Sequence, residues 1–352
     1  MRSVEVDLAA IRSNYQLLKN TFAPAKVMAV VKANAYGHGM LQVAKALESA
    51  GVDALGVADV QEAISLRMSG IKSRIVCWLI LPADLELAAD HEIEVGISTF
   101  EQLAAVTENN KIHIKLDTGL GRNGFAEADL DRLVSELSGR EVVGIFSHLS
   151  NTSETEDRIQ KDKFDQAVDK IRRAGVAFTE RHLAASAASI SYSDFHYEMV
   201  RCGIAVYGLT PFEDRELPLA LQPAMRVVAK LVNVKKVSAG QGVSYGYRYV
   251  TDKPTTLGLV PFGYGEGMPR ISVGHNVLIA GKLYPVVGRV AMDQFVVDLA
   301  GDEPAIGEDV VIFGWAARGE PTAEQLGQSS QSINYEIVTR IGGRANRVYL
   351  NR

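Results

Sequence analysis

The sequence has few cysteines and no long apolar run. Only Cys77 and Cys202 occur, each in an apolar context and without the spacing of metal ligands. This usage predicts buried free thiols in a reducing compartment. No run reaches the roughly 18 apolar residues of a membrane helix, and residues 1–7 lack the apolar core of a secretion signal. We therefore expect a cytoplasmic protein with no membrane partner.

Charge of one sign is also scarce. The net charge is −5, charged residues make up 22% of the chain, and hydrophobic residues make up 47%. This slight acidity argues against nucleic acid as a partner, because phosphates select basic surfaces. The 352 residues are enough for two domains, or for one barrel with an appendage.

Strand-like and helix-like segments alternate over the first part of the chain. The expected strands are 27–31, 52–58, 74–79, 93–98, 111–117, 142–149, 181–185 and 199–207. The expected helices include 8–22, 41–50, 60–68, 100–107 and 158–174. Eight strand-helix units predict a closed parallel (β/α)8 barrel of the TIM type.

The pattern changes near residues 209–211. Beyond it, short alternating runs punctuated by glycine and proline predict a mostly antiparallel β domain. The expected strands are 227–235, 256–261, 276–279, 283–287, 294–298 and 309–313, with a short helix over 322–326. We therefore expect an α/β fold with a barrel over residues 1–220 and a β domain over residues 221–352.

A lysine follows the most apolar of these segments. The run 27–31 suits a strand buried on both faces, and Lys32 stands at its carboxyl end, where barrel enzymes hold their catalytic groups. Partial burial lowers the pKa of a lysine and yields an amine that can form a Schiff base. On this pattern alone, a lysine that simply reaches solvent is an equally good interpretation.

Other candidate residues follow later strands. Glycine-rich residues 118–124 carry Arg122 directly after a strand that contains Lys115, which suits an anionic ligand, although a plain glycine turn remains open. His148 ends the sixth expected strand and His182 opens the seventh. A lone histidine is more often a satisfied polar group than a catalyst, but two that point to one end of the barrel favour a functional role. Ser186 follows the seventh strand, where barrels often bind phosphate, or it serves as a helix cap.

These segments resemble those of alanine racemases from residue 6 to residue 349. The matching strings are 27–39, 115–124, 200–208, 242–246, 288–294 and 333–338. The resemblance implies a pyridoxal 5′-phosphate cofactor held as an imine by Lys32. The residues that it assigns to the cofactor phosphate are Tyr36, Ser186, Gly203, Ile204 and Tyr335.

The resemblance also assigns roles around the cofactor ring. Arg122 matches the arginine beside the phenolate oxygen and the substrate carboxylate, and Lys115 matches a lysine that is often carbamylated and braces that arginine. His148 and His182 match residues that stack under the ring or support Arg201. Arg201 matches the arginine that faces the pyridine nitrogen. Because an arginine keeps its proton, the ring remains a weak electron sink, which favours a racemase over a decarboxylase.

Racemisation needs one proton carrier on each face of the substrate. The resemblance gives these roles to Lys32 and Tyr245, the latter from a partner subunit, and gives the partner's Met292 amide to the substrate carboxylate. It implies a homodimer with shared active sites that interconverts L- and D-alanine for peptidoglycan, with no metal. The alternatives are a broader racemase of small amino acids such as serine, a same-fold decarboxylase, and a non-catalytic cofactor carrier.

Three segments depart from the family pattern. Ala185 stands where an asparagine is common, Gly265 and Glu266 replace an alanine and an aspartate, and residues 342–345 replace a proline-bearing tail. The first two bear on cofactor support and on the polarity of the channel. None of the three removes a group with an assigned catalytic role.

Overall fold

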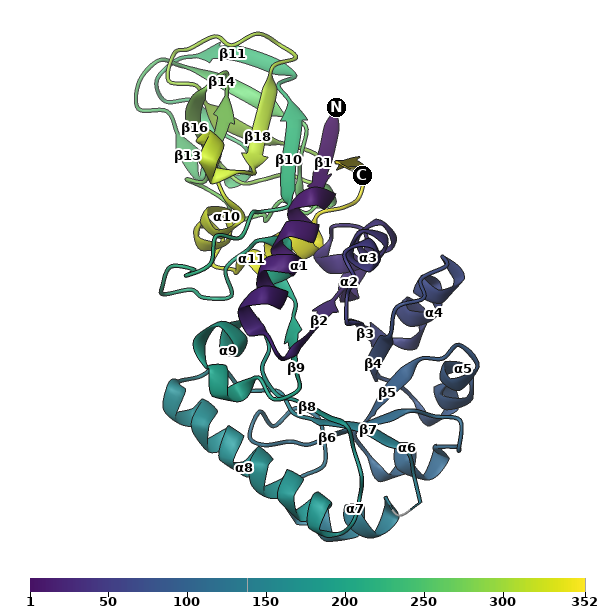
Figure 1. The fold of residues 1–352 in the computed structure, drawn as a ribbon. Helices are drawn as coiled ribbons and strands as arrows, with labels where there is room; N and C mark the ends of the chain where they lie inside the picture. The colour runs from purple at the N-terminus through teal and green to yellow at the C-terminus, as the bar shows by residue number, and fades with distance from the viewer. Residues whose placement is uncertain (138, 352) are drawn as a thin grey trace.

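The computed structural model describes residues 1–137 and 139–351 and contains a parallel eight-stranded sheet that curls into a barrel (Figure 1). The strand order is β8-β7-β6-β5-β4-β3-β2-β9. The strands are β2 Lys26–Val30, β3 Ala54–Asp59, β4 Ile75–Leu79, β5 Glu94–Ile97, β6 Ile112–Lys115, β7 Val142–Phe146, β8 Glu180–His182 and β9 Met199–Cys202. The predicted barrel and its fold class are confirmed.

The two end strands of this sheet meet next to Arg201. The backbone N–H of Arg201 donates to the carbonyl of Ala184 at 2.9 Å, and Ala185 and Arg201 form a parallel bridge. This contact joins the end of β8 to β9 and completes the ring. The barrel therefore closes at a residue that the sequence marks as a cofactor ligand.

Helices cover the outside of the barrel (Figure 1). They are α1 Leu8–Phe22, α3 Met40–Ser49, α4 Val60–Met68, α5 Leu85–Asp90, α6 Phe100–Ala105, α7 Leu130–Glu136, α8 Glu154–Arg173 and α9 Ser186–Ser191, while the short segment α2 Lys32–Tyr36 follows the carboxyl end of β2. Helix α1 begins where Asp7 accepts hydrogen bonds from the N–H groups of Ala9 and Ala10, as an N-cap does. Helices 8–22 and 60–68 end where the sequence predicts.

The β domain is built on a nine-stranded sheet of order β11-β14-β17-β16-β15-β18-β10-β1-β19. Its strands are β1 Arg2–Asp7, β10 Met225–Lys230, β11 Asn233–Val237, β14 Thr255–Val260, β15 Asn276–Ile279, β16 Lys282–Val287, β17 Phe295–Asp298, β18 Asp309–Phe313 and β19 Asn346–Leu350. Strands β12 Gly242–Val243 and β13 Tyr249–Val250 form a separate pair. Except for β1 with β19, the pairs in this domain are antiparallel.

Three sequence expectations are corrected by these strands. Residues 227–235 form the ends of two strands, β10 and β11, rather than one. The strand expected over 199–207 ends at Cys202, and Ile204–Tyr207 forms a 3-10 turn. Strand β1 was not expected, and it lies between β10 and β19 in the sheet of the β domain.

Helices α10 Ala323–Ser329 and α11 Asn334–Arg340 lie between the two domains (Figure 1). Helix α11 packs tightly on the turn after Lys32. A side chain at Gly37 would place its Cβ 2.1 Å from the carbonyl oxygen of Val338. Arg347, on β19, donates to the carbonyl of Gly37 at 2.7 Å. The β domain thereby supports the segment that carries Lys32. Among the described residues, no helix is both long and apolar enough to cross a membrane.

The segment that supports Lys32 has an unusual backbone. Ala33, Asn34, Ala35 and Tyr36 all have φ between 51° and 56°. Left-handed turns cost L-residues roughly 1–2 kcal/mol each, so neighbouring contacts must stabilise this one. Glu62 accepts from the N–H of Ala33 at 2.6 Å. These contacts hold the chain in a tight left-handed turn that the sequence pattern did not reveal.

Because α11 packs on this turn, Gly37→Ala should strongly lower the free energy of unfolding. Gly51 has a similar φ (+71° against +79°), but no atom lies within 4 Å of a Cβ there. We expect Gly51→Ala to lower the free energy of unfolding by about 1 kcal/mol, from backbone strain alone. Gly37→Ala should lower it by at least about 3 kcal/mol, because its Cβ also meets a backbone carbonyl. Urea denaturation measures both, and equal losses would contradict this account of the packing.

Candidate active site

A cavity of about 1080 Å³ opens at the carboxyl ends of the barrel strands. From the residues singled out in the sequence, it is lined by Lys32, Tyr36, Lys115, Arg122, His148, Ser186, Arg201, Gly203, Ile204 and Tyr335. These residues come from the carboxyl ends of five barrel strands, β2, β6, β7, β8 and β9, and from α11 of the β domain. The barrel places them together because the carboxyl ends of all its parallel strands face one side.

Four of the residues singled out in the sequence face this cavity as cations. Lys32 stands two residues beyond β2 and is half-buried, and its Nζ lies 6.0 Å from the centre of the Trp78 ring. Burial, followed by the charge of Arg122, lowers the pKa of Lys32 below its ordinary value, and Glu62 opposes the shift. A lysine with a lowered pKa is a better nucleophile and a better proton acceptor near neutral pH.

Lys115 and Arg122 are two further cations at this cavity. Lys115 ends β6 and is 5% exposed, while Arg122 lies exposed on the following loop. Burial, and then the charges of Arg122 and Arg201, lowers the pKa of Lys115 to about 8. The loop is shaped by Asp117, whose carboxylate accepts from the N–H groups of Gly119 and Gly121 at 3.0 and 3.1 Å. No carboxylate of the described residues forms an ion pair with either cation.

Ser186, Gly203 and Tyr36 converge at one end of the cavity. The hydroxyl of Ser186 accepts from the N–H of Gly203 at 3.0 Å. A Cβ at Gly203 would lie 2.2 Å from the hydroxyl oxygen of Tyr36, so only glycine fits there. The rings of Tyr36 and Tyr335 have centroids 6.2 Å apart. Burial raises the pKa of both tyrosines, which therefore present neutral hydroxyl groups.

Arg201 forms the floor of the cavity and is buried. Its Nη2 donates to the carbonyls of Ser147 and Leu183 at 2.7 and 3.0 Å and lies 3.1 Å from Nδ1 of His148. Its Nη1 donates to the carbonyl of His182 and lies 3.1 Å from Nδ1 of the same residue. Burial lowers the pKa of Arg201 to about 10, so it stays a cation at neutral pH. Within residues 1–137 and 139–351, its Nε–H has no hydrogen-bond acceptor.

Both histidines that contact Arg201 are uncharged. Burial, and then the charge of Arg201, lowers the pKa of His148 to about 3. Burial, the neighbouring His113 and Arg201 lower the pKa of His182 well below its ordinary value. His148 lines the cavity, whereas His182 lies behind Arg201 in the barrel interior.

Sequence reasoning missed several residues of this region. Trp78, Phe146 and Asp157 also line the cavity. Trp78 lies near the carboxyl end of β4, and this position alone could have marked it. Asp157 is 3% exposed and sits near the start of α8. His113 and Glu94 were missed because they occupy strand positions that look like ordinary core positions.

Tyr245 and Met292 do not line this cavity. They are 70% and 55% exposed, and both lie on loops of the β domain. The two loops are joined, because the hydroxyl of Ser244 donates to the carbonyl of Arg289 at 2.6 Å. The structure thus brings these two residues onto one exposed surface, but away from the cavity of their own chain.

The departure at Gly265 and Glu266 is accommodated within the β domain. Glu266 is fully buried and accepts from the N–H of Gly263 at 2.8 Å and from Arg344 at 2.5 Å. The N–H of Gly265 donates to the carbonyl of Met292 at 2.8 Å. Two of the segments that differ from the family pattern therefore contact each other and support the loop that carries Met292.

Models of protein families match both domains of the chain. The alanine racemase N-terminal domain matches residues 6–211, and the alanine racemase C-terminal domain matches residues 224–349. The chain belongs to the alanine racemase family.

Individual relatives match over almost their whole length. The alanine racemase of Thermobifida fusca (strain YX) is 42% identical over 362 residues, covering 98% of this chain and 96% of that protein. The structure of alanine racemase from D-cycloserine-producing Streptomyces lavendulae matches with a TM-score of 0.96 at 42% identity, covering 100% of this chain and 97% of the other. The alanine racemase from Bacillus anthracis with bound L-Ala-P matches with a TM-score of 0.92 at 33% identity, covering 100% and 95%.

The charges around the alanine racemase cavity predict a measurable shift in the pKa of Lys115. In carbon dioxide-free buffer, Lys115 should titrate near 8, because burial and two neighbouring cations disfavour its charged form. Arg122→Ala removes one of those cations, so the pKa of Lys115 should rise. NMR of isotopically labelled lysine side chains measures both values. Arg318→Ala, at an exposed arginine of the β domain, should leave the pKa of Lys115 unchanged. A fall of this pKa in Arg122→Ala would contradict the assignment.

Proposed function

We propose that this chain is a pyridoxal 5′-phosphate-dependent racemase that interconverts L- and D-alanine. The observation that carries the proposal is that Lys32, Lys115, Arg122 and Arg201, four of the cations that line one cavity, lie around the same space. Like charges that face one cavity repel one another, so anionic groups are needed to stabilise them. A phosphate, a phenolate and a substrate carboxylate would supply these charges, and a carbamate on Lys115 would add another.

The residues present fit this cofactor. Ser186, Gly203, Ile204, Tyr36 and Tyr335 would hold its phosphate, since hydroxyl and amide groups converge there and the missing Cβ of Gly203 leaves room. Arg122 would hold its phenolate oxygen. The Nε–H of Arg201 would donate to its pyridine nitrogen, because the other donors of that guanidinium are already used.

When bound, pyridoxal phosphate withdraws electrons from the α-carbon of the amino acid and acidifies its proton. Lys32 carries the cofactor and then accepts or returns a proton on one face of that carbon, which its lowered pKa favours. Tyr245 does the same on the opposite face. Arg122 and the backbone N–H of Met292 orient the substrate carboxylate. Arg201 keeps its own proton and so limits the electron withdrawal that other reactions require.

This division of work requires a homodimer. Tyr245 and Met292 are exposed and lie outside the cavity of their own chain, so a partner subunit would bring them to Lys32. Symmetry then gives two equivalent active sites, each built from both subunits. The buried free thiols of Cys77 and Cys202 suit a reducing cytoplasm, where D-alanine would feed peptidoglycan synthesis.

Two alternative activities are a decarboxylase, which would differ from a racemase at the residue facing the pyridine nitrogen, and a racemase that accepts a slightly larger substrate. A same-fold decarboxylase would need a carboxylate at the pyridine nitrogen, and the groups around Arg201 are carbonyls and imidazoles. A small amino acid such as serine is the second candidate substrate, because one small substituent changes binding by only about 1–3 kcal/mol. Racemase assays on a panel of L-amino acids separate these activities.

The role of Lys32 predicts that one substitution removes both the absorbance of the bound cofactor and the conversion of L- to D-alanine. The purified protein with pyridoxal phosphate should show the absorbance of a lysine-bound cofactor and should convert L-alanine to D-alanine. Lys32→Ala should lose both, because the amine is absent. Lys26→Ala, at the opposite end of the same strand, is the control and should keep both. Racemisation by Lys32→Ala at the wild-type rate would refute the proposal.

Shared active sites predict rescue between two inactive variants. Tyr245→Phe should lower kcat by about 10²–10⁴-fold, as expected for loss of a proton carrier. When Lys32→Ala and Tyr245→Phe subunits are mixed, each mixed dimer keeps one intact site. Random exchange should therefore restore about a quarter of wild-type activity. Chiral chromatography of the product measures this, and no gain on mixing would argue against residues that act across the subunits.

A further inference from the structure

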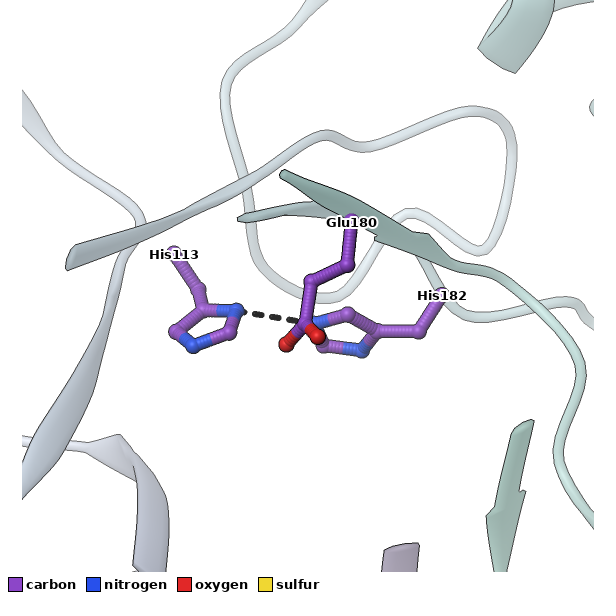
Figure 2. A group of neighbouring side chains, drawn as sticks. All are labelled: His113, Glu180 and His182. Carbon is purple, nitrogen blue, oxygen red and sulfur yellow. Dashed lines mark hydrogen bonds between the residues drawn. The ribbon is translucent and has the colours of Figure 1, made fainter. Parts of the chain in front are cut away.

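A chain of hydrogen bonds leads from the cavity floor into the interior of the barrel. Nη1 of Arg201 lies 3.1 Å from Nδ1 of His182, and Nε2 of His182 lies 2.9 Å from Nδ1 of His113. Nε2 of His113 lies 2.9 Å from a carboxylate oxygen of Glu94. All four side chains are buried. Figure 2 shows the middle link, the contact between the two imidazole rings.

The far end of this chain is held by ion pairs at the amino ends of the strands. Arg74 donates to both oxygens of Glu94, at 2.7 and 2.6 Å. It also pairs with Glu180, which lies 3.8 Å from Lys26. Burial raises the pKa of Glu94, but the hydrogen bonds from His113 and Arg74 outweigh it and bring the pKa down to about 2. Glu94 is therefore an anion that only accepts hydrogen bonds.

The two ends of the chain fix its direction. A guanidinium only donates, so Nδ1 of His182 must accept from Arg201. A neutral His182 then carries its proton on Nε2 and donates to Nδ1 of His113. His113 in turn carries its proton on Nε2 and donates to Glu94. Each ring thus has one permitted neutral tautomer, and an added proton on Nδ1 of His113 would set two N–H groups against each other.

A metal site is the competing explanation for these residues. The ligand atoms of His113, Glu180 and His182 lie within 4.8 Å of one another, as Figure 2 shows. However, the two ring nitrogens that face each other are 2.9 Å apart and share a proton, and the carboxylate of Glu180 is paired with Arg74. Every one of these groups already has a partner, so the hydrogen-bond chain explains them more fully than an ion does.

We propose that Arg201, His182, His113 and Glu94 form a directional hydrogen-bond relay, in which His113 is a positioning residue for the cavity. By accepting from Nε2 of His182, His113 holds the lone pair of His182 Nδ1 toward Arg201. This contact fixes the guanidinium with its Nε–H turned to the cavity. The effect of this guanidinium orientation on racemisation rests on the proposed function. The hydrogen bonds of the relay do not depend on it.

The first test observes the ring protons directly. The chain has only seven histidines, so ¹⁵N-labelled imidazoles can be assigned by NMR with single variants. We expect His113 and His182 each to carry a proton on Nε2 and a lone pair on Nδ1. A proton on Nδ1 of either ring would overturn the relay. This measurement needs neither the cofactor nor activity.

The second test separates positioning from stability. His113→Phe removes both hydrogen bonds and should lower kcat for alanine about 10- to 100-fold with little change in KM, as for other residues that orient a ligand through a neighbour. His113→Gln, which offers one acceptor and one donor group, should recover most of kcat. His275→Phe is the matched control, because His275 is a buried histidine of the β domain that bonds the carbonyl of Ile312 at 2.8 Å. It should lower Tm similarly but leave kcat unchanged.

Each outcome decides a defined claim. Unchanged kcat in His113→Phe, or an equal loss in His275→Phe, overturns the positioning role. If His113→Phe does not fold, Glu94→Gln replaces it: the amide can also donate, so a second tautomer of His113 should appear in the NMR spectrum, and its absence would overturn the relay. If the wild-type tautomers are as expected but no racemisation occurs, the proposed function fails while the relay stands.

Discussion

The hydrogen bonds of Arg201 are the interaction on which the rest of the site depends. Its backbone N–H joins β9 to the end of β8 and completes the barrel, while its guanidinium forms the cavity floor. Closing the sheet and positioning the cation are therefore one structural event. The cost of burying this charge is offset by carbonyl groups and imidazoles rather than by a carboxylate, which leaves the net charge of the cavity positive.

The second constraint is that neither domain builds the site alone. The barrel contributes Lys32, but the left-handed turn after it is packed against α11 and bonded to Arg347 of the β domain. The same helix contributes Tyr335 to the cavity. The contact between the domains thus determines both the backbone of the lysine segment and part of the cavity wall. A change in the orientation of the domains would alter the site without touching a catalytic group.

Much of the fold could be predicted from the sequence, because buried parallel strands and amphipathic helices leave strong periodic patterns. Lys32 was found because a charge at the end of an apolar strand is rarely a packing choice, whereas Arg201 was found through the resemblance of its segment to alanine racemases. Strand β1 was missed because both of its partners, β10 and β19, lie far from it in the sequence. The turn after Lys32 was missed because its alanines favour right-handed helix, and His113 because a histidine inside a strand gives no local sign of its distant partners.

Strand β1 also has a consequence for biosynthesis. Val4 pairs with Val227 on one side and with Arg347 on the other, so β1 can complete its pairing only after β19, far later in the chain, has been synthesised. Until then its edges and apolar residues remain uncovered, which invites association with other nascent chains. The sheet of the β domain is therefore completed only once β19 has been synthesised, and the barrel can fold before the lysine segment receives its final support.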